Sequence, residues 1–142
     1  MPLFALSFLV VILSNLIYHF SQKSIPRGAH PIVSLLVTYG VAIGITLLLI
    51  PFFPLKEPIG RELRKLNWSS AVIGASIVGV ELGFLLAYRS GWRISVGSAA
   101  ANAAVAALLV PTGLVLFGEK LSEANIAGLV LCLAGLLLVV MR

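Results

Sequence analysis

The sequence predicts an all-α integral membrane protein, a bundle of five transmembrane helices. Two observations lead to this fold class. First, 60% of the 142 residues are hydrophobic and 11% are charged, whereas a soluble domain carries roughly 25% charged residues. Second, five apolar stretches follow one another, each near the roughly 20 residues with which a helix crosses the hydrocarbon core. We therefore expect a single transmembrane domain over residues 1–142, with almost nothing left for a soluble domain.

The five expected spans are, in chain order, residues 3–20, 31–53, 69–88, 94–117 and 124–141. The first has no cation before its apolar run and lacks a small-residue cleavage site, so we interpret it as a retained helix rather than a secretory signal. Proline and glycine mark the connections between spans. Trp68 and Trp92 fall at span ends, where indole rings favour the headgroup layer.

The segment 55–67, between the second and third spans, is expected to lie in the membrane interface. Its apolar residues recur at spacings of four, four and three: Leu55, Ile59, Leu63 and Leu66. Cations occupy positions between them: Lys56, Arg61, Arg64 and Lys65. A short helix here would bury the apolar side chains among acyl chains and point the cations at lipid phosphates. Anionic lipid headgroups are therefore expected partners, through simple anchoring or through a lipid-specific role.

The third span contains Glu81, the only acidic residue within a predicted span. Hydrocarbon offers a carboxyl no partner, and removal from water disfavours the charged form, so we expect the carboxyl to be neutral near neutral pH. We interpret Glu81 as a proton-coupling residue, the alternative being a neutral carboxyl that joins two helices by one hydrogen bond. Tyr88 lies two turns further along the same helical face with Phe84 between them, and this face is expected to be a pocket wall.

Two other polar stripes are expected to help enclose a substrate path. The first span carries one at spacings i, i+3, i+4 and i+7: Asn15, Tyr18, His19 and Gln22. The fourth span carries another at spacings of three and four: Ser95, Ser98 and Asn102. The alternative is hydrogen bonding between helices, and for Asn15 and Asn102 both interpretations stay open. His19 is near a span end, where an interfacial role is favoured over a proton relay, although pH could switch its charge.

No metal, cofactor or catalytic residue is expected. His19 and His30 lack further ligands at a familiar spacing. Cys132 is the single cysteine, which excludes an internal disulfide or a cysteine-based zinc site. Hydrolytic and redox patterns are also missing, so an enzyme is not expected. The net charge of +5 comes from cations in short loops rather than on one contiguous face, which argues against nucleic acid as a partner.

The end of the chain carries a recognisable pattern. Pro111 lies inside the fourth span, where it removes a backbone donor, frees the carbonyl of Ala107 and is expected to bend the helix. It is followed by Phe117-Gly118-Glu119-Lys120-Leu121-Ser122, and then by Gly128 and Gly135 in the last span. This pattern resembles the drug/metabolite transporter superfamily, specifically the closing part of an EamA-type five-helix repeat, and is related to the small multidrug transporters.

The loop after the fourth span is expected to be structural rather than catalytic, and this applies to Gly118, Glu119 and Ser122. Ser122 can cap the last helix, with Asn125 as an imperfect capping-box partner. The small multidrug transporters have four helices and a glutamate in the first helix, where this chain has Ser14 and Asn15. They also carry a tryptophan in the helix that corresponds to residues 94–117, which this chain lacks. Both differences argue against cationic multidrug chemistry.

Superfamily members with ten helices resemble two such repeats in opposite orientation, so this chain is expected to be half of an inverted-repeat carrier. With five spans, one side of the membrane receives Lys56, Arg61, Arg64, Lys65 and Lys120, and the other receives Lys23, Arg27, Arg89, Arg93 and Arg142. Orientation follows an excess of Lys and Arg in cytoplasmic loops, and five against five leaves no excess. We expect dual topology and an antiparallel homodimer, with Glu81, Tyr88 and Asn102 of each copy facing a central cavity.

The expected function is secondary active transport of a small organic metabolite or drug, with proton coupling through Glu81, in a plasma membrane of the bacterial inner-membrane type. One alternative is a flippase, or a flippase subunit, for a lipid-linked headgroup. Another is a non-transporting membrane partner subunit. A single sequence does not specify the substrate, because transporter pockets select by shape and by a few polar groups placed in three dimensions.

Overall fold

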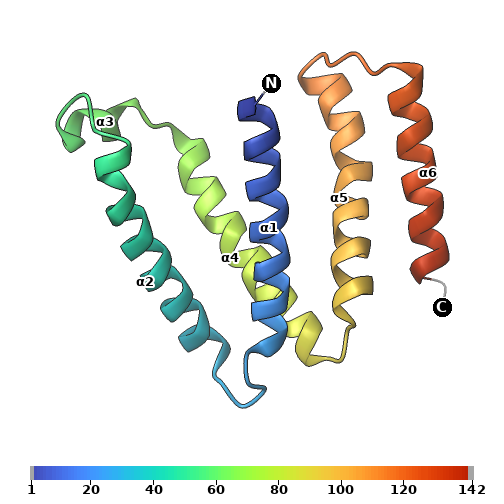
Figure 1. Ribbon diagram of the computed structural model, residues 1–142, viewed down its shortest axis with the longest axis horizontal. Helices are drawn as coiled ribbons and strands as arrows, with labels where there is room; N and C mark the ends of the chain where they lie inside the picture. Colours follow the sequence, from blue (N-terminus) through green and yellow to red (C-terminus); the bar gives the residue numbers. More distant parts are fainter. Residues whose placement is uncertain (1, 141–142) are drawn as a thin grey trace. The chain divides into compact units, whose positions relative to one another are not determined.

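The computed structural model describes residues 2–140, and no strand occurs among them (Figure 1). The elements in chain order are α1 (Pro2–Ser24), α2 (Pro31–Leu49), the 3-10 turn η1 (Ile50–Phe52), α3 (Ile59–Lys65), α4 (Trp68–Arg89), α5 (Ile94–Leu116) and α6 (Glu123–Val140). The prediction of an all-α chain is confirmed. Each predicted span corresponds to one long helix, with ends that differ by a few residues.

The number of helices differs from the predicted five. Residues 2–140 contain six α-helices because part of the expected interfacial segment forms α3. By length and hydropathy, four helices of the described chain are suited to cross a membrane: Leu3–Ser24, Pro31–Phe52, Trp68–Arg89 and Ile94–Leu116. α6 is 18 residues long, Glu123–Val140, and its stretch Glu123–Gly135 is also apolar. Length and composition therefore support four of the five predicted spans among the described residues, and α6 lies at the position of the fifth.

The second predicted span, 31–53, changes character near its end. Pro31 occupies the first helical turn, where a missing N–H costs no hydrogen bond. Pro51 cannot donate to the carbonyl of Leu47, so the α-helical pattern stops. The N–H of Ile50 bonds to the Leu47 carbonyl instead, and the chain continues as the 3-10 turn Ile50–Phe52.

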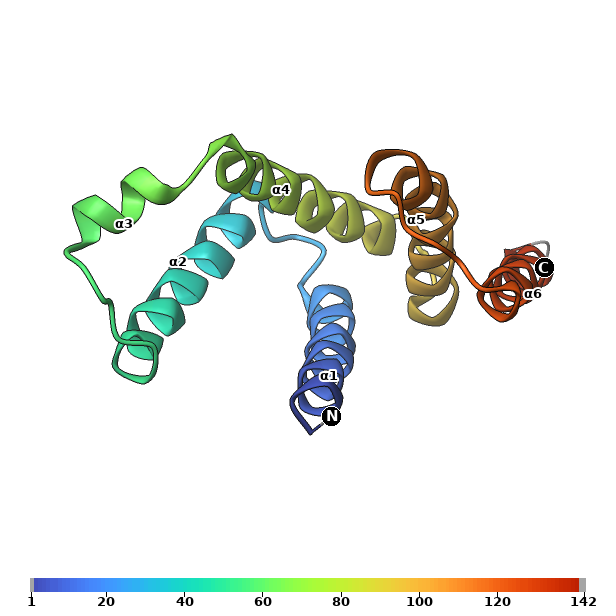
Figure 2. The ribbon, with the colours of Figure 1, turned by 90° about the horizontal axis from the view of Figure 1, so that it is seen from above.

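Two units make up the described chain. Ser24–Arg89 form one, and the remaining described residues form the other. In the first, α2 packs against α4, and α3 lies on the connection that runs from the end of α2 to the start of α4 (Figure 1 and Figure 2). In the second, α5 packs against α6, while α1 packs against neither of them in the described range.

The surface of the described helices is strongly apolar. Leu35, Leu85 and Tyr88 are the buried members of the apolar core in the described part of the chain, whereas side chains such as Phe4 and Val115 are more than three quarters exposed, at 77% and 79%. Water disfavours an apolar surface of this extent, but lipid tails are as apolar as leucine. The surface is therefore suited to a hydrocarbon environment.

The segment 55–67 contains one short helix. α3 covers Ile59–Lys65, so Leu55 precedes it and Leu66 follows it. The predicted apolar residues are all exposed, at 50–63%, as contact with acyl chains requires. Lys65 is the exception among the cations, because its Nζ pairs with carboxylate oxygens of Glu57 at 3.4 Å and Glu62 at 3.1 Å. This lysine is held by acidic neighbours within the segment rather than left to point at lipid phosphates.

Candidate functional site

A groove lies between α2 and α4, within the unit Ser24–Arg89. Its lining is mostly apolar and includes a few polar side chains. Its volume is about 450 Å³, and it is lined by Thr38, Tyr39, Ala42, Ile43, Thr46, Gly74, Ile77, Val78 and Glu81. The four lining residues of α4 recur at i, i+3, i+4 and i+7, the spacing of one helical face. Glu81 is therefore the polar member of an otherwise apolar stripe that faces α2.

Tyr39 supplies the second polar group of this groove. Its hydroxyl oxygen is buried and has no hydrogen-bond partner among the described residues. Glu81 lines the same groove from the opposite helix. A buried polar group without a partner costs about 1–3 kcal/mol, and hydrocarbon supplies no water to satisfy it. The groove therefore holds hydrogen-bonding capacity that the protein itself does not use.

The threonines of the groove are less available. The hydroxyl of Thr46 donates to the backbone carbonyl of Ala42 at 2.8 Å, a local bond within α2 that is common for threonine in helices. The remaining lining residues on both helices, apart from Thr38, are apolar or glycine. Tyr39 and Glu81 are consequently the two titratable groups among the lining residues.

Of the expected pocket wall of Glu81, Phe84 and Tyr88, Glu81 is the member that lines the α2–α4 groove. The rings of Phe84 and Tyr88 stack, with centroids 5.8 Å apart and planes inclined by 28°, and Tyr88 is only 3% exposed. Neither aromatic residue lines the groove that contains Glu81. Glu81 is thus associated with α2, while the two rings form a packed pair further along α4.

The polar stripe of α1 forms a cluster near the end of that helix. The rings of Tyr18 and His19 meet edge to face, with centroids 5.0 Å apart, and Gln22 Nε2 donates to the Tyr18 hydroxyl at 3.4 Å. His19 and Gln22 are buried, whereas Asn15, one turn earlier, is exposed. Lys23 Nζ donates to the carbonyl of Trp92 at 2.8 Å and links the end of α1 to the loop before α5.

The polar stripe of α5 does not meet that of α1. Ser98 uses its hydroxyl within its own helix, donating to the carbonyl of Ile94 at 2.7 Å. Asn102 is exposed. α1 and α5 do not pack together in the described residues, and the substrate path expected between these two stripes stays a prediction.

Pro111 is accommodated within a continuous helix. α5 runs through it to Leu116, so the proline does not divide the fourth span. Its missing N–H leaves the carbonyl of Ala107 without the usual donor one turn later. Ala107 lines an apolar groove of about 360 Å³ between α5 and α6.

The loop after α5 is held by local backbone and capping hydrogen bonds. Gly118 adopts a φ of 62°, the left-handed conformation that ends many helices. The N–H of Glu119 donates to the carbonyl of Gly113 at 3.1 Å. Ser122 Oγ accepts a bond from the N–H of Asn125 at 3.2 Å, which is the geometry of a helix N-cap.

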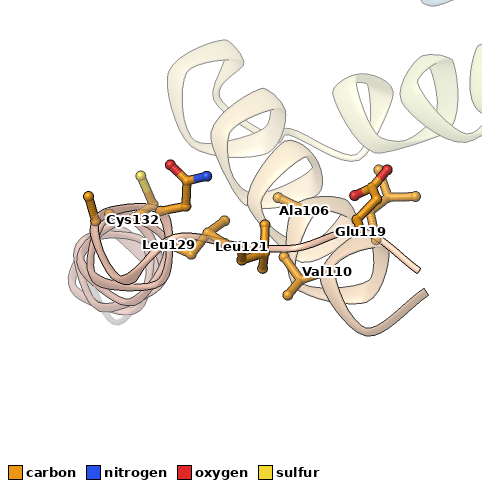
Figure 3. Close-up of a pocket in the computed structure, with 10 residues that line it drawn as sticks. Ala106, Val110, Glu119, Leu121, Leu129 and Cys132 are labelled. Atoms are coloured by element: carbon orange, nitrogen blue, oxygen red, sulfur yellow. The ribbon is translucent and has the colours of Figure 1, made fainter. Parts of the chain in front are cut away.

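A second groove lies on another face of the α5–α6 pair, with a volume of about 590 Å³. Figure 3 shows Val110 and Ala106 on α5, Leu129 and Cys132 on α6, and Leu121 and Glu119 on the connection between them. The lining is mainly apolar, and its polar residues are Glu119, Asn125 and Cys132. Glu119 therefore lies on the connection at the end of the two helices and not in the interior of a span.

Comparison with known proteins identifies the family. Residues 1–141 match the EamA-like transporter family. The chain belongs to this family. The resemblance to the drug/metabolite transporter superfamily is therefore confirmed, and this EamA-like chain is an integral membrane protein of a transporter family. No curated protein and no solved structure matches it.

Tyr39 is the site residue of this EamA-like chain that the sequence analysis missed. A single tyrosine in a long apolar run is ordinary in a membrane helix and attracts no attention alone. The available signal was the spacing of Thr38, Ala42 and Thr46 at i, i+4 and i+8, which marks a face of α2 with smaller and more polar residues. That face is the one that α2 presents to Glu81.

Proposed function

We propose that this EamA-like chain is a secondary active transporter of small organic molecules, with Glu81 as its proton-carrying residue. The observation that carries the proposal is the Glu81 carboxyl in the α2–α4 groove of about 450 Å³. A groove of this size lies within the range of roughly 300–1,000 Å³ typical of small-molecule sites. An acidic side chain at the centre of a span costs about 2.5–3.5 kcal/mol on insertion scales, which makes a functional role the default interpretation.

Coupling follows from the cost of burying charge. When the groove opens to water, Glu81 exchanges its proton with that side of the membrane. When the groove closes, the charged carboxylate loses its hydration and the neutral form is favoured. Closure therefore favours the protonated carboxyl, and the proton moves with the conformational change that exposes the groove alternately to the two sides.

The functional unit we propose is an antiparallel homodimer, with α6 as the fifth span of each copy. The Lys and Arg residues are divided five against five between the two sides of the membrane, so they favour neither orientation of the chain. Two small-residue pairs are also open: a Cβ added at Gly40, Gly44, Gly79 or Gly83 would meet nothing within 4 Å. Such faces permit close approach of a further helix, which a second copy would supply.

The exposed polar residues of α1 and α5 fit the same arrangement. Asn15 and Asn102 lie on the surface of one chain, where hydrocarbon would leave their amides without partners. We propose that they face the second copy and, with Tyr88, line the approach to the substrate. Lys56, Arg61 and Arg64 remain for contact with anionic lipid headgroups at the membrane surface.

Proteoliposomes test the proton-coupled function. Purified protein is reconstituted with a pH-sensitive dye inside, and a panel of small organic metabolites and drugs is added under a pH gradient. Substrate-dependent proton movement is expected for the wild type and for Glu123→Gln, a matched control outside the groove, but not for Glu81→Gln. Proton movement that persists in Glu81→Gln would contradict the assignment. Lipid movement insensitive to Glu81 would favour the flippase alternative.

Reporters at the C-terminus test the dimer topology. One reporter that is active in the cytoplasm and one that is active outside it are fused in separate strains. Comparable activity of both is expected when the chain inserts in the two orientations. Activity of only one would contradict the antiparallel homodimer, while leaving open a transporter that pairs with a different half-carrier.

A further inference from the structure

The α2–α4 groove is complete within one chain. All of its lining residues come from α2 and α4, and both helices belong to the unit Ser24–Arg89. A cavity shared at the centre of a homodimer would hold one ligand between two copies. A groove whose polar and apolar lining is supplied by one chain predicts one ligand for each copy.

The polar groups of the groove define what such a ligand must offer. The Tyr39 hydroxyl is buried without a hydrogen-bond partner in the described residues, and it can donate to an acceptor brought from outside. Glu81 faces the same groove and, in the neutral form on which the proposed function rests, also carries an O–H donor. No other residue that lines the groove titrates. The groove therefore contains a hydroxyl donor without a partner among the described residues, in a lining that is otherwise mostly apolar.

We propose that each chain carries its own binding site in the α2–α4 groove, for a compact, mostly apolar molecule whose carbonyl oxygen accepts a hydrogen bond from Tyr39. A carbonyl oxygen accepts hydrogen bonds and so satisfies the Tyr39 hydroxyl. An ammonium group offers only donors and leaves the Tyr39 proton without an acceptor. Tyr39 is therefore the residue that determines specificity for a carbonyl group over an ammonium group.

Fluorine NMR provides the direct test. The chain has three tyrosines, so labelling with 3-fluorotyrosine gives three signals, each assigned by a tyrosine-to-phenylalanine variant. The probe is 4-phenylbutyramide, and 4-phenylbutylamine is its matched amine. The amide is expected to shift the Tyr39 signal saturably, with one molecule bound per chain by calorimetry, and to bind more tightly than the amine.

Variants separate recognition from folding. Tyr39→Phe keeps the ring and removes the hydroxyl, and it should weaken amide binding about tenfold, the loss expected for one buried hydrogen bond. Thr112→Val removes a hydroxyl from α5 and should leave the affinity unchanged. The fluorine spectra of both variants report whether the remaining tyrosines keep their native environment.

The outcomes are distinct from those for the proposed function. Preference for the amine, one ligand per two chains, or unchanged affinity in Tyr39→Phe would overturn the inference, as would the absence of saturable amide binding. None of these results bears on proton movement through Glu81. Conversely, loss of the proton-coupled function with amide binding intact would leave the site assigned and remove its transport role.

Discussion

The carboxylate of Glu119 lies against Gly113, where the helix has no side chain. A Cβ built on Gly113 would be 2.5 Å from Glu119 Oε2 and 3.1 Å from its Cδ. The backbones of the two residues are also joined, because the N–H of Glu119 donates to the Gly113 carbonyl at 3.1 Å. Gly113 is buried within α5. Because it has no side chain, it leaves space for the loop that leads to α6.

We predict that Gly113→Ala stabilises the protein only after Glu119 has been truncated. In a helix interior, alanine is normally favoured over glycine by roughly 0.5–1 kcal/mol. Here the added methyl group displaces the Glu119 carboxylate, which offsets that gain. A double-mutant cycle with Glu119→Ala, followed by thermal unfolding in detergent, should show a coupling of about 0.5–1 kcal/mol between the two positions.

Gly128→Ala is the control for this cycle. A Cβ at Gly128 meets nothing within 4 Å, so its effect should be the same with and without Glu119. Additive effects at Gly113 and Glu119 would show that the contact between them does not contribute to stability.

The two glycines with positive φ should respond differently to asparagine. Gly118, with a φ of 62°, lies in the left-handed region that asparagine tolerates, whereas Gly91, with a φ of 105°, lies outside it. Alanine should cost about 1–2 kcal/mol at Gly118, and asparagine clearly less. At Gly91 both residues should be poorly tolerated. Melting temperatures of the four variants test this contrast, and equal losses for both substitutions at Gly118 would contradict it.

Removal of the α6 cap should loosen the start of that helix. Ser122→Ala removes the acceptor for the Asn125 N–H and should cost about 1 kcal/mol, whereas Ser122→Asp retains an acceptor. Hydrogen exchange at the Asn125 amide should accelerate in the alanine variant and stay slow in the aspartate variant. An unchanged exchange rate in Ser122→Ala would show that the hydroxyl is not the cap that holds this end.

Much of the secondary structure could be predicted because helix length and helix ends are local properties. Long apolar runs define the spans, and residues such as Gly118 and Ser122 act within one turn of their own positions. The 3-10 turn that follows α2 could not be predicted from hydropathy, because the apolar run continues through Pro51, the residue that removes the donor that the α-helix needs. A count based on hydropathy extends a span beyond such a point.

The pairing of α2 with α4 could not be predicted, for a different physical reason. A soluble helix shows its packing face as an apolar stripe, but a membrane helix is apolar on every side and shows no such contrast. Glu81 was identified by its charge alone, whereas Tyr39 becomes informative only once α2 is placed opposite it. The same limit applies to Asn15 and Asn102, whose residue type indicates a partner without indicating which helix provides it.

Orientation variants give the sharpest test of the antiparallel homodimer. Arg27→Gln with Arg93→Gln changes the distribution of cations from five against five to five against three, and Arg61→Gln with Lys120→Gln changes it to three against five. None of these four cations forms an ion pair in the described residues, unlike Lys65. The substitutions should therefore alter orientation with little effect on folding. Each variant should insert with its cation-rich side in the cytoplasm, so the two should point in opposite directions.

A homodimer that needs both orientations makes a strict prediction for activity. Each orientation variant alone should lack substrate-dependent proton movement, because every copy points the same way. Co-expression of the two should restore it, since opposite copies are again available to pair. Adding Glu81→Gln to one member of the pair then tests whether proton movement requires the Glu81 carboxyl of both copies. Full activity of either variant alone, with a single orientation verified by C-terminal reporters, would show that transport does not require an inverted partner.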